Sequence, residues 1–191
     1  MKRSDVSSYL YHWVSGENKE NAFKQLSDIV SAGKILANNS MIKGGYFCIC
    51  FTETPIQINF AHKTRYSSFG FRFKKKYIFN LGGRPVIYQP DSEYDLLPEE
   101  LRWRHVRYEL DKVTPIDFTW EREWRIQIDE LKLDPYEISI VVPNKEDAQE
   151  LERRFDEAEI DRYIMECLGY GDEIAEYPKP LVYKISPIDS D

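Results

Sequence analysis

The sequence lacks the features of a membrane-spanning, secreted or metal-binding protein. No apolar run approaches the ~18–20 residues that a bilayer span needs, and the N-terminus has no apolar signal core. Cysteine is scarce and odd in number, with three residues, and the neighbouring Cys48 and Cys50 have no second pair or histidine at ligand spacing. We therefore expect no metal, no membrane contact and reduced cysteines in a cytoplasmic protein.

Several motifs of common enzyme classes are also absent. The chain contains no phosphate-binding Gly-x-x-x-x-Gly-Lys-Ser/Thr loop and no Gly-x-Gly-x-x-Gly dinucleotide fingerprint. It has neither the Gly-x-Ser-x-Gly motif of serine hydrolases nor the His-Glu-x-x-His motif of zinc proteases. Any chemistry must therefore come from a less regular group of residues.

A general excess of positive charge is missing too, since the net charge is −7 and the isoelectric point is near 5.1. The negative net charge does not favour the binding of nucleic acid. One segment differs, because residues 62–76 hold seven basic or histidine side chains and no acid. This basic run predicts a local surface for the phosphates of a dinucleotide or of a nucleic acid.

The composition that is present is typical of a globular domain. Of the 191 residues, 42% are hydrophobic and 14% aromatic, mostly tyrosine and phenylalanine, which favours strands over a helical bundle. We predict one α+β domain over residues 1–191, with a mixed or antiparallel sheet and flanking helices. Its core is expected over 8–142, with a C-terminal helix and strand, 143–191, packed on it.

Hydrophobic periodicity places the main elements. We expect helices over 21–33, ended by Gly33, and over 143–160, capped by Asn144. The strands are expected over these ranges: 8–15, 46–51, 119–128, 136–142 and part of 177–188. Residues 82–89 are expected as a glycine turn that leads into a strand. Residues 69–79 are expected to form a strand pair or a strand and a turn, and 91–110 a loop with one or two helices.

Three groups of residues carry potential chemistry. His12 precedes Ser15 and Gly16 at the end of a strand, which indicates the rim of a site, although a single strand histidine is more often structural. Thr52 and Thr54 expose hydroxyls where a strand ends at proline, which is also the pattern of a simple strand stop.

The third group is the stretch TWEREWRI, residues 119–126. Side chains two apart share a strand face, so Glu121, Glu123 and Arg125 are expected together, with Arg122 among the tryptophans on the other face. One interpretation is an exposed strand whose ion pairs contribute little to stability. The other is a carboxylate pair, in which one member holds a substrate hydroxyl and the other handles the nucleophile.

The order of the segments resembles a known family. Residues 9–128 contain YHWVSG, NAFKQLSDIVSAGKI, CFTETP, YSSFGFRFKKKYI, GGRPVIY and EREWRI in succession. This order is similar to that of the AbiGi-type abortive-infection proteins, described as antitoxins of bacterial phage-resistance systems. It also resembles, more loosely, the DarT-type ADP-ribosyltransferases.

The second resemblance implies an ADP-ribosyltransferase-like fold that binds NAD. Glu123 would be the catalytic carboxylate, and Glu121 would orient the acceptor. The NAD-binding residues would be His12 at a ribose, Ser15 beside the nicotinamide, Thr52 and Thr54 in the pocket wall, and an aromatic ring that stacks on nicotinamide, from among Tyr11, Trp13, Tyr46 and Phe51. The phosphate-binding arginine would be Arg65, Arg72 or Arg84. The first resemblance implies instead a non-catalytic module that binds a cognate toxin or operator DNA.

Overall fold

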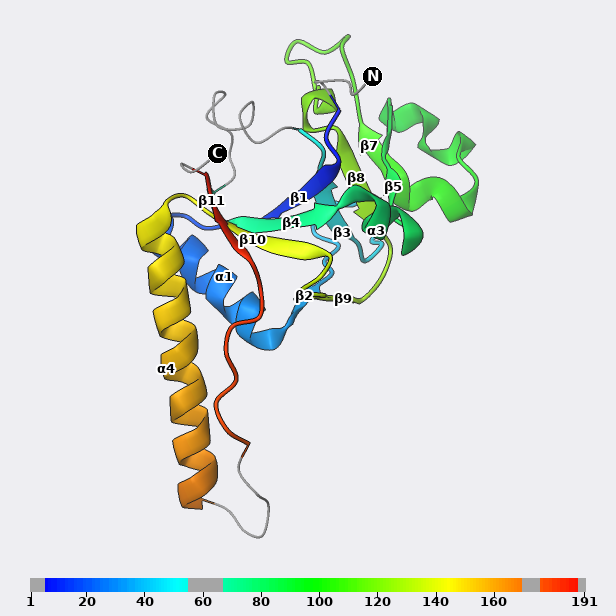
Figure 1. The fold of residues 1–191 in the computed structure, drawn as a ribbon. Helices are drawn as coiled ribbons and strands as arrows, with labels where there is room; N and C mark the ends of the chain where they lie inside the picture. The colour runs from blue at the N-terminus through cyan, green and yellow to red at the C-terminus, as the bar shows by residue number, and fades with distance from the viewer. Residues whose placement is uncertain (1–5, 55–66, 170–175, 189–191) are drawn as a thin grey trace.

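The computed structural model of the protein describes residues 6–54, 67–169 and 176–188. Figure 1 shows a twisted sheet with α1 and the first half of α4 on one side and the 91–118 segment at one end. Within the described ranges no helix is long and apolar enough to cross a membrane. Part of the basic run, residues 62–66, lies outside them.

The helices and strands alternate irregularly along the chain. The α-helices are α1 (Lys19–Ala32), α3 (Lys75–Asn80) and α4 (Lys145–Gly169), and the 3₁₀ helices are η1 (Asp91–Leu96), η2 (Glu99–Arg104) and η3 (Thr119–Glu121). The strands are β1 (Tyr9–Trp13), β2 (Lys34–Leu36), β3 (Ile49–Thr52), β4 (Gly70–Lys74), β5 (Arg84–Pro85), β6 (Ile87–Gln89), β7 (His105–Arg107), β8 (Glu123–Ile126), β9 (Glu130–Lys132), β10 (Ile138–Val142) and β11 (Ile185–Pro187).

The main sheet has seven strands in the order β11-β10-β4-β1-β3-β8-β5. Only β10 and β11 run parallel in it, and the other neighbours are antiparallel. Two small sheets pair β2 with β9 and β6 with β7. The predicted α+β class with a mixed sheet is therefore confirmed.

One face of the main sheet forms the hydrophobic core. Alternate strand residues, such as Leu10, Phe71 and Phe73, are fully buried there beneath the apolar side of α1 and Leu151 of α4. Helix α1 ends as predicted, because Gly33 has the left-handed φ of 64° that a side chain disfavours. Helix α4 begins as predicted, since the amide of Asp147 donates to Oδ1 of Asn144 at 2.8 Å.

The opposite face carries a row of polar and aromatic residues. The register places Glu123 of β8 beside Thr52 of β3, and Thr52 beside Tyr11 of β1. Arg125 and Cys50 form the next pair on β8 and β3. Directly opposed residues share a face, so these polar residues all lie on the non-core side of the sheet, whereas His12, opposite Phe71, lies on the core side.

Three predicted elements are wrong in part. The single strand expected within residues 82–89 is divided between β5 and β6, which belong to different sheets. Residues 75–80, expected as strand or turn, form helix α3. Residues 119–128 do not form one strand, because η3 occupies 119–121 and Arg122 adopts a left-handed φ of 46° before β8 begins. Arg122 is consequently exposed and not on the tryptophan face, and Trp120 is 43% exposed.

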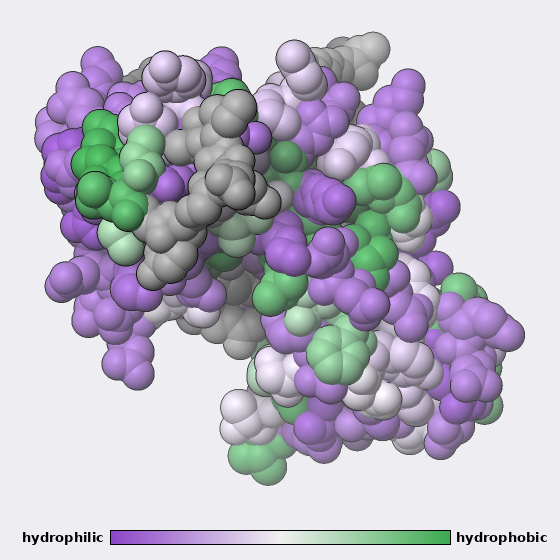
Figure 2. All heavy atoms as spheres, turned by 90° about the horizontal axis from the view of Figure 1, so that it is seen from below, coloured by the Kyte–Doolittle hydropathy of each residue, from purple (hydrophilic) through white to green (hydrophobic). Residues whose placement is uncertain are grey.

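Helix α4 continues well beyond its predicted end and projects from the body as an arm beside residues 176–184 (Figure 1). Figure 2 views the molecule from this end and shows apolar side chains on the arm surrounded by hydrophilic ones. The exposed apolar residues of the arm are Ile160, Ile164, Met165, Leu168, Tyr177 and Val182.

Candidate functional site

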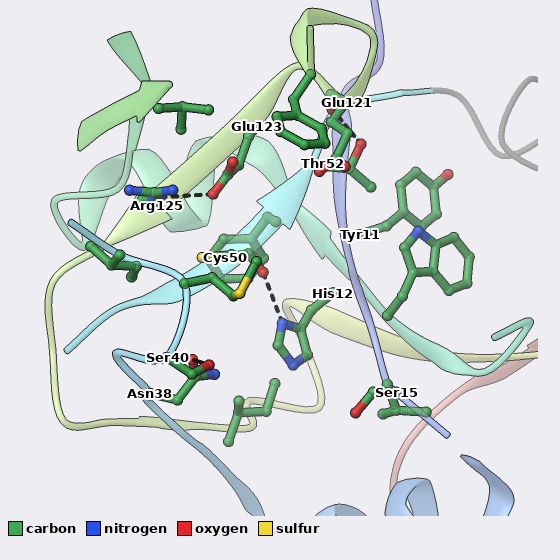
Figure 3. Close-up of a pocket in the computed structure, with 18 of the residues that line it drawn as sticks. Tyr11, His12, Ser15, Asn38, Ser40, Cys50, Thr52, Glu121, Glu123 and Arg125 are labelled. Carbon is green, nitrogen blue, oxygen red and sulfur yellow. Dashed lines mark hydrogen bonds and ion pairs between the residues drawn. The ribbon is translucent and has the colours of Figure 1, made fainter. Parts of the chain in front are cut away.

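A cleft of about 1180 Å³ opens where β1 and β3 part. These strands are joined at one register pair, Tyr11 with Thr52, whereas β1 pairs with β4 along its whole length. The walls come from the end of β1, one side of α1, β2, β3 and the segments around residues 105–107 and 116–125 (Figure 3). Sites that enclose drug-sized ligands measure about 300–1,000 Å³, so this cleft has room for a dinucleotide.

His12 bridges the two parting strands. Its Nδ1 lies 2.8 Å from the carbonyl oxygen of Cys50 (Figure 3), and because a carbonyl only accepts, Nδ1 carries the proton. The packing around it is tight, since a Cβ on Gly70 of β4 would lie 2.4 Å from the His12 carbonyl oxygen. Burial lowers the pKa of His12, and the Cys50 carbonyl offsets this only in part. The ring is therefore neutral at pH 7, held in one tautomer on the cleft wall.

Glu123 lines the same cleft from β8 and is held by a buried arginine. Nε of Arg125 donates to Oε1 of Glu123 at 2.7 Å, and the two side chains are only 5% and 12% exposed (Figure 3). Nη1 of Arg125 also donates to the carbonyls of Trp103, at 3.0 Å, and His105, at 2.9 Å. Burial disfavours the charge of Arg125, but the Glu123 carboxylate outweighs it, and the pKa of Arg125 lies above its usual value.

Cys50 completes this polar wall. Burial, followed by the charge of Glu123, raises the pKa of the Cys50 thiol, so the thiol stays protonated. Arg125 therefore fixes the orientation of Glu123, and the protonated Cys50 thiol lies on the neighbouring strand β3. An oriented carboxylate of this kind can accept a hydrogen bond from a substrate hydroxyl.

Glu121 reaches the cleft by a different route from the one predicted. It lies on η3 rather than on the strand, is 4% exposed, and is directed by the turn at Arg122. The hydroxyl of Thr52 donates to the Glu121 carbonyl, and the hydroxyl of Thr54 donates to the Trp120 carbonyl. The carboxylates thus share a cleft (Figure 3) because of a turn and not because of strand alternation.

The other predicted NAD-binding residues have mixed positions. Ser15, Thr52 and Trp13 line the cleft, whereas Thr54 is absent from the lining that the described residues form. Oγ of Ser15 donates to Gln25 at 3.2 Å. Trp13 stacks on Tyr11 with ring centroids 5.4 Å apart, so their shared faces are already occupied.

None of the described arginine candidates lies in the cleft. Arg72 donates to Ser139 and Ser186 on the sheet, and Arg84 donates to the carbonyls of Phe79 and Gly83. Arg65 lies outside the described residues. The cleft arginines are Arg107 and Arg125. Strand alternation had placed Arg125 with Glu123, but no sequence signal marked Arg107.

Two of the three described lysines of the basic run are matched by acids. Lys74 lies 3.2 Å from Glu137, and Lys75 lies 2.6 Å from Glu53. These pairs reduce the positive field that the run offers to phosphates. In the described ranges no three His, Cys, Asp or Glu residues gather to hold a metal ion.

The fold and cleft define an α+β protein with two carboxylates and a neutral histidine around a dinucleotide-sized hollow. No family model, curated protein or solved structure matches the chain, so the comparisons assign it to no family.

Proposed function

We propose that the protein is an NAD-dependent ADP-ribosyltransferase-like enzyme of a phage-defence system. The observation that carries the proposal is that Glu123 and His12 line one cleft and that each is fixed by a second group, Arg125 and the Cys50 carbonyl. The register places His12 opposite Phe71 on the core face and Glu123 opposite Thr52 on the other face, so the two residues share a cleft only through the opening between β1 and β3.

The reaction follows from the chemistry of the nicotinamide bond. The bond between ribose C1′ and the nicotinamide nitrogen breaks, and its electron pair leaves with the neutral nicotinamide. The ribose becomes cation-like, and the Glu123 carboxylate stabilises it while accepting a hydrogen bond from the 2′-hydroxyl. The acceptor then bonds to C1′, and its proton passes to Glu121.

The neighbouring groups have supporting roles. His12 presents Nε2 to a ribose hydroxyl, because Nδ1 is already used on Cys50. Phe51 lines the cleft and offers an aromatic ring near His12, with centroids 6.0 Å apart. Ser15, just beyond the end of β1, and Thr52 on β3 line the same cleft. These contacts would orient the dinucleotide across the opening between β1 and β3.

A substitution of Glu123 tests the proposal. Incubation with NAD labelled in nicotinamide should give release by the wild type, and Glu123→Gln should reduce the rate by about 10²–10³-fold, as loss of one preorganised electrostatic group does. Glu157→Gln, on an exposed part of α4, is the matched control and should behave like the wild type. Equal release by the wild type and Glu123→Gln, or no release at all, refutes the enzyme.

A second function, a non-catalytic antitoxin that binds a cognate toxin, is favoured by two observations. The Glu123 carboxylate is engaged by Arg125, and the α4 arm exposes apolar side chains. Co-purification with the neighbouring gene product tests it. Ile164→Glu on the arm should abolish capture, and Glu157→Gln should leave it intact.

A further inference from the structure

The cleft has a second lobe beyond Arg125, made by η1, β7 and the loop at Lys43. Asp91, His105, Arg107 and Lys43 all line it. It adjoins the Glu123 wall directly, because Arg125 holds Glu123 with Nε and the His105 carbonyl with Nη1.

Two buried nitrogens in this lobe are left without a hydrogen bond. Nε2 of His105 and Nε of Arg107 have no hydrogen-bond partner in the described part of the chain, and His105 is only 3% exposed. The nearest acid is Asp91, whose Oδ1 lies 3.9 Å from the histidine nitrogen and whose Oδ2 lies 3.8 Å from the arginine nitrogen. Both distances exceed hydrogen-bond range. Buried unsatisfied nitrogens are costly and call for a partner.

The charges of this lobe of the cleft restrict what that partner can be. An anion would meet the carboxylate of Asp91, and a cation would meet Lys43, 3.2 Å from Asp91, and Arg107. A neutral hydroxyl avoids both conflicts, because it donates to a carboxylate and accepts from a guanidinium. It also satisfies His105 in either tautomer, since a hydroxyl is both donor and acceptor.

Two adjacent hydroxyls match the arrangement better than one. The two oxygens of Asp91 face different nitrogens, so two hydroxyls, one at each oxygen and nitrogen pair, would satisfy both nitrogens. Ile116 and Phe118 line the same cleft and provide apolar contact for a ring attached to the sugar. Vicinal hydroxyls next to a planar ring are the chemistry of a ribonucleoside.

We propose that Asp91, His105 and Arg107 form a subsite for the 2′,3′-diol of a ribonucleoside. This deepens and rests on the proposed function, because that function supplies two sources of such a diol. One is the adenosine end of NAD, and the other is a ribonucleoside in the acceptor.

The first experiment tests the diol without any turnover. Calorimetric titration of the full chain with adenosine and with 2′,3′-dideoxyadenosine should show about tenfold weaker binding of the dideoxy compound, the loss expected for one hydrogen bond to a charged group. Asp91→Asn and His105→Gln should remove this difference. Asp95→Asn is the matched control, since Asp95 belongs to the same helix η1, is 86% exposed in its side chain, and is not part of the cleft lining.

The second experiment separates the two sources. If the diol belongs to NAD, Asp91→Asn weakens NAD about tenfold and leaves nicotinamide mononucleotide, which lacks adenosine, unchanged. If it belongs to the acceptor, Asp91→Asn leaves NAD binding unchanged, and adenosine binds to the NAD-saturated protein. Equal binding of adenosine and the dideoxy compound by the wild type, or no binding of adenosine at millimolar concentration, overturns the subsite. Failure of the proposed function would appear instead in the Glu123→Gln release assay.

Discussion

The cleft wall and the α4 arm use the same type of contact, an arginine and glutamate pair, in opposite environments. Arg125 and Glu123 are nearly buried, and Arg125 makes two further hydrogen bonds to carbonyls. Arg153 on α4 pairs with Glu150 and Glu157, but its side chain is 53% exposed. Water competes for the charges of the exposed pairs, so these pairs contribute little to stability. The buried pair fixes the orientation of the Glu123 carboxylate and is costly to break.

Breaking the buried pair should give the largest effect. Arg125→Met keeps most of the side-chain volume but leaves Glu123 and two carbonyls without their donor, and we expect a loss of about 3–5 kcal/mol in the free energy of unfolding. Urea denaturation measures it. The double variant with Glu123→Met should recover part of this loss, because no uncompensated charge remains. A double variant no more stable than Arg125→Met would show that the carbonyl contacts, and not the charge pair, dominate.

A smaller effect is expected where the cleft wall depends on a hydroxyl. Thr52 donates to the Glu121 carbonyl and accepts from the Thr54 amide at 3.1 Å, and it is 5% exposed. Thr52→Val retains the shape and leaves both groups unsatisfied, so we expect a loss of about 1–3 kcal/mol. Thr119→Val, which removes an exposed hydroxyl bonded to Asp117, is the control and should change little.

The same hydroxyls explain which part of the site could be predicted. Alternation placed Arg125 with Glu123, and helix caps at Gly33 and Asn144 were found because these signals are local. The turn at 119–122 was missed because its carbonyls are bonded to Thr52 and Thr54, almost seventy positions earlier in the chain, and local periodicity does not report such contacts. The unsatisfied nitrogen of His105 was likewise invisible before η1 and β7 came together.

Acidification should lower the stability of the protein through His12 on the cleft wall. Because burial lowers its pKa from 6.5, the unfolded chain binds more protons than the native chain below that value. Stability should therefore be fully present above pH 6.5 and fall as the pH drops below it, by at most about 1.4 kcal/mol per pH unit for one proton. His12→Asn retains a donor for the Cys50 carbonyl and removes the titration. The difference in unfolding free energy between the two proteins should be flat from pH 8 to 7 and change below 6.5, and a flat difference down to pH 5 would contradict the buried neutral ring.

The smallest effect is expected on the arm. Arg153→Ala removes contacts to both Glu150 and Glu157, which is more ion pairing by count than Arg125 makes with Glu123. Its urea midpoint should nevertheless stay close to that of the wild type, because solvent replaces each lost contact. Any difference seen at low ionic strength should shrink as salt is added, since exposed charges are screened. A large, salt-insensitive loss would show that Arg153 is effectively buried, and that the arm is covered by another surface in solution. The contrast between the two regions therefore depends on burial and not on the number of ion pairs.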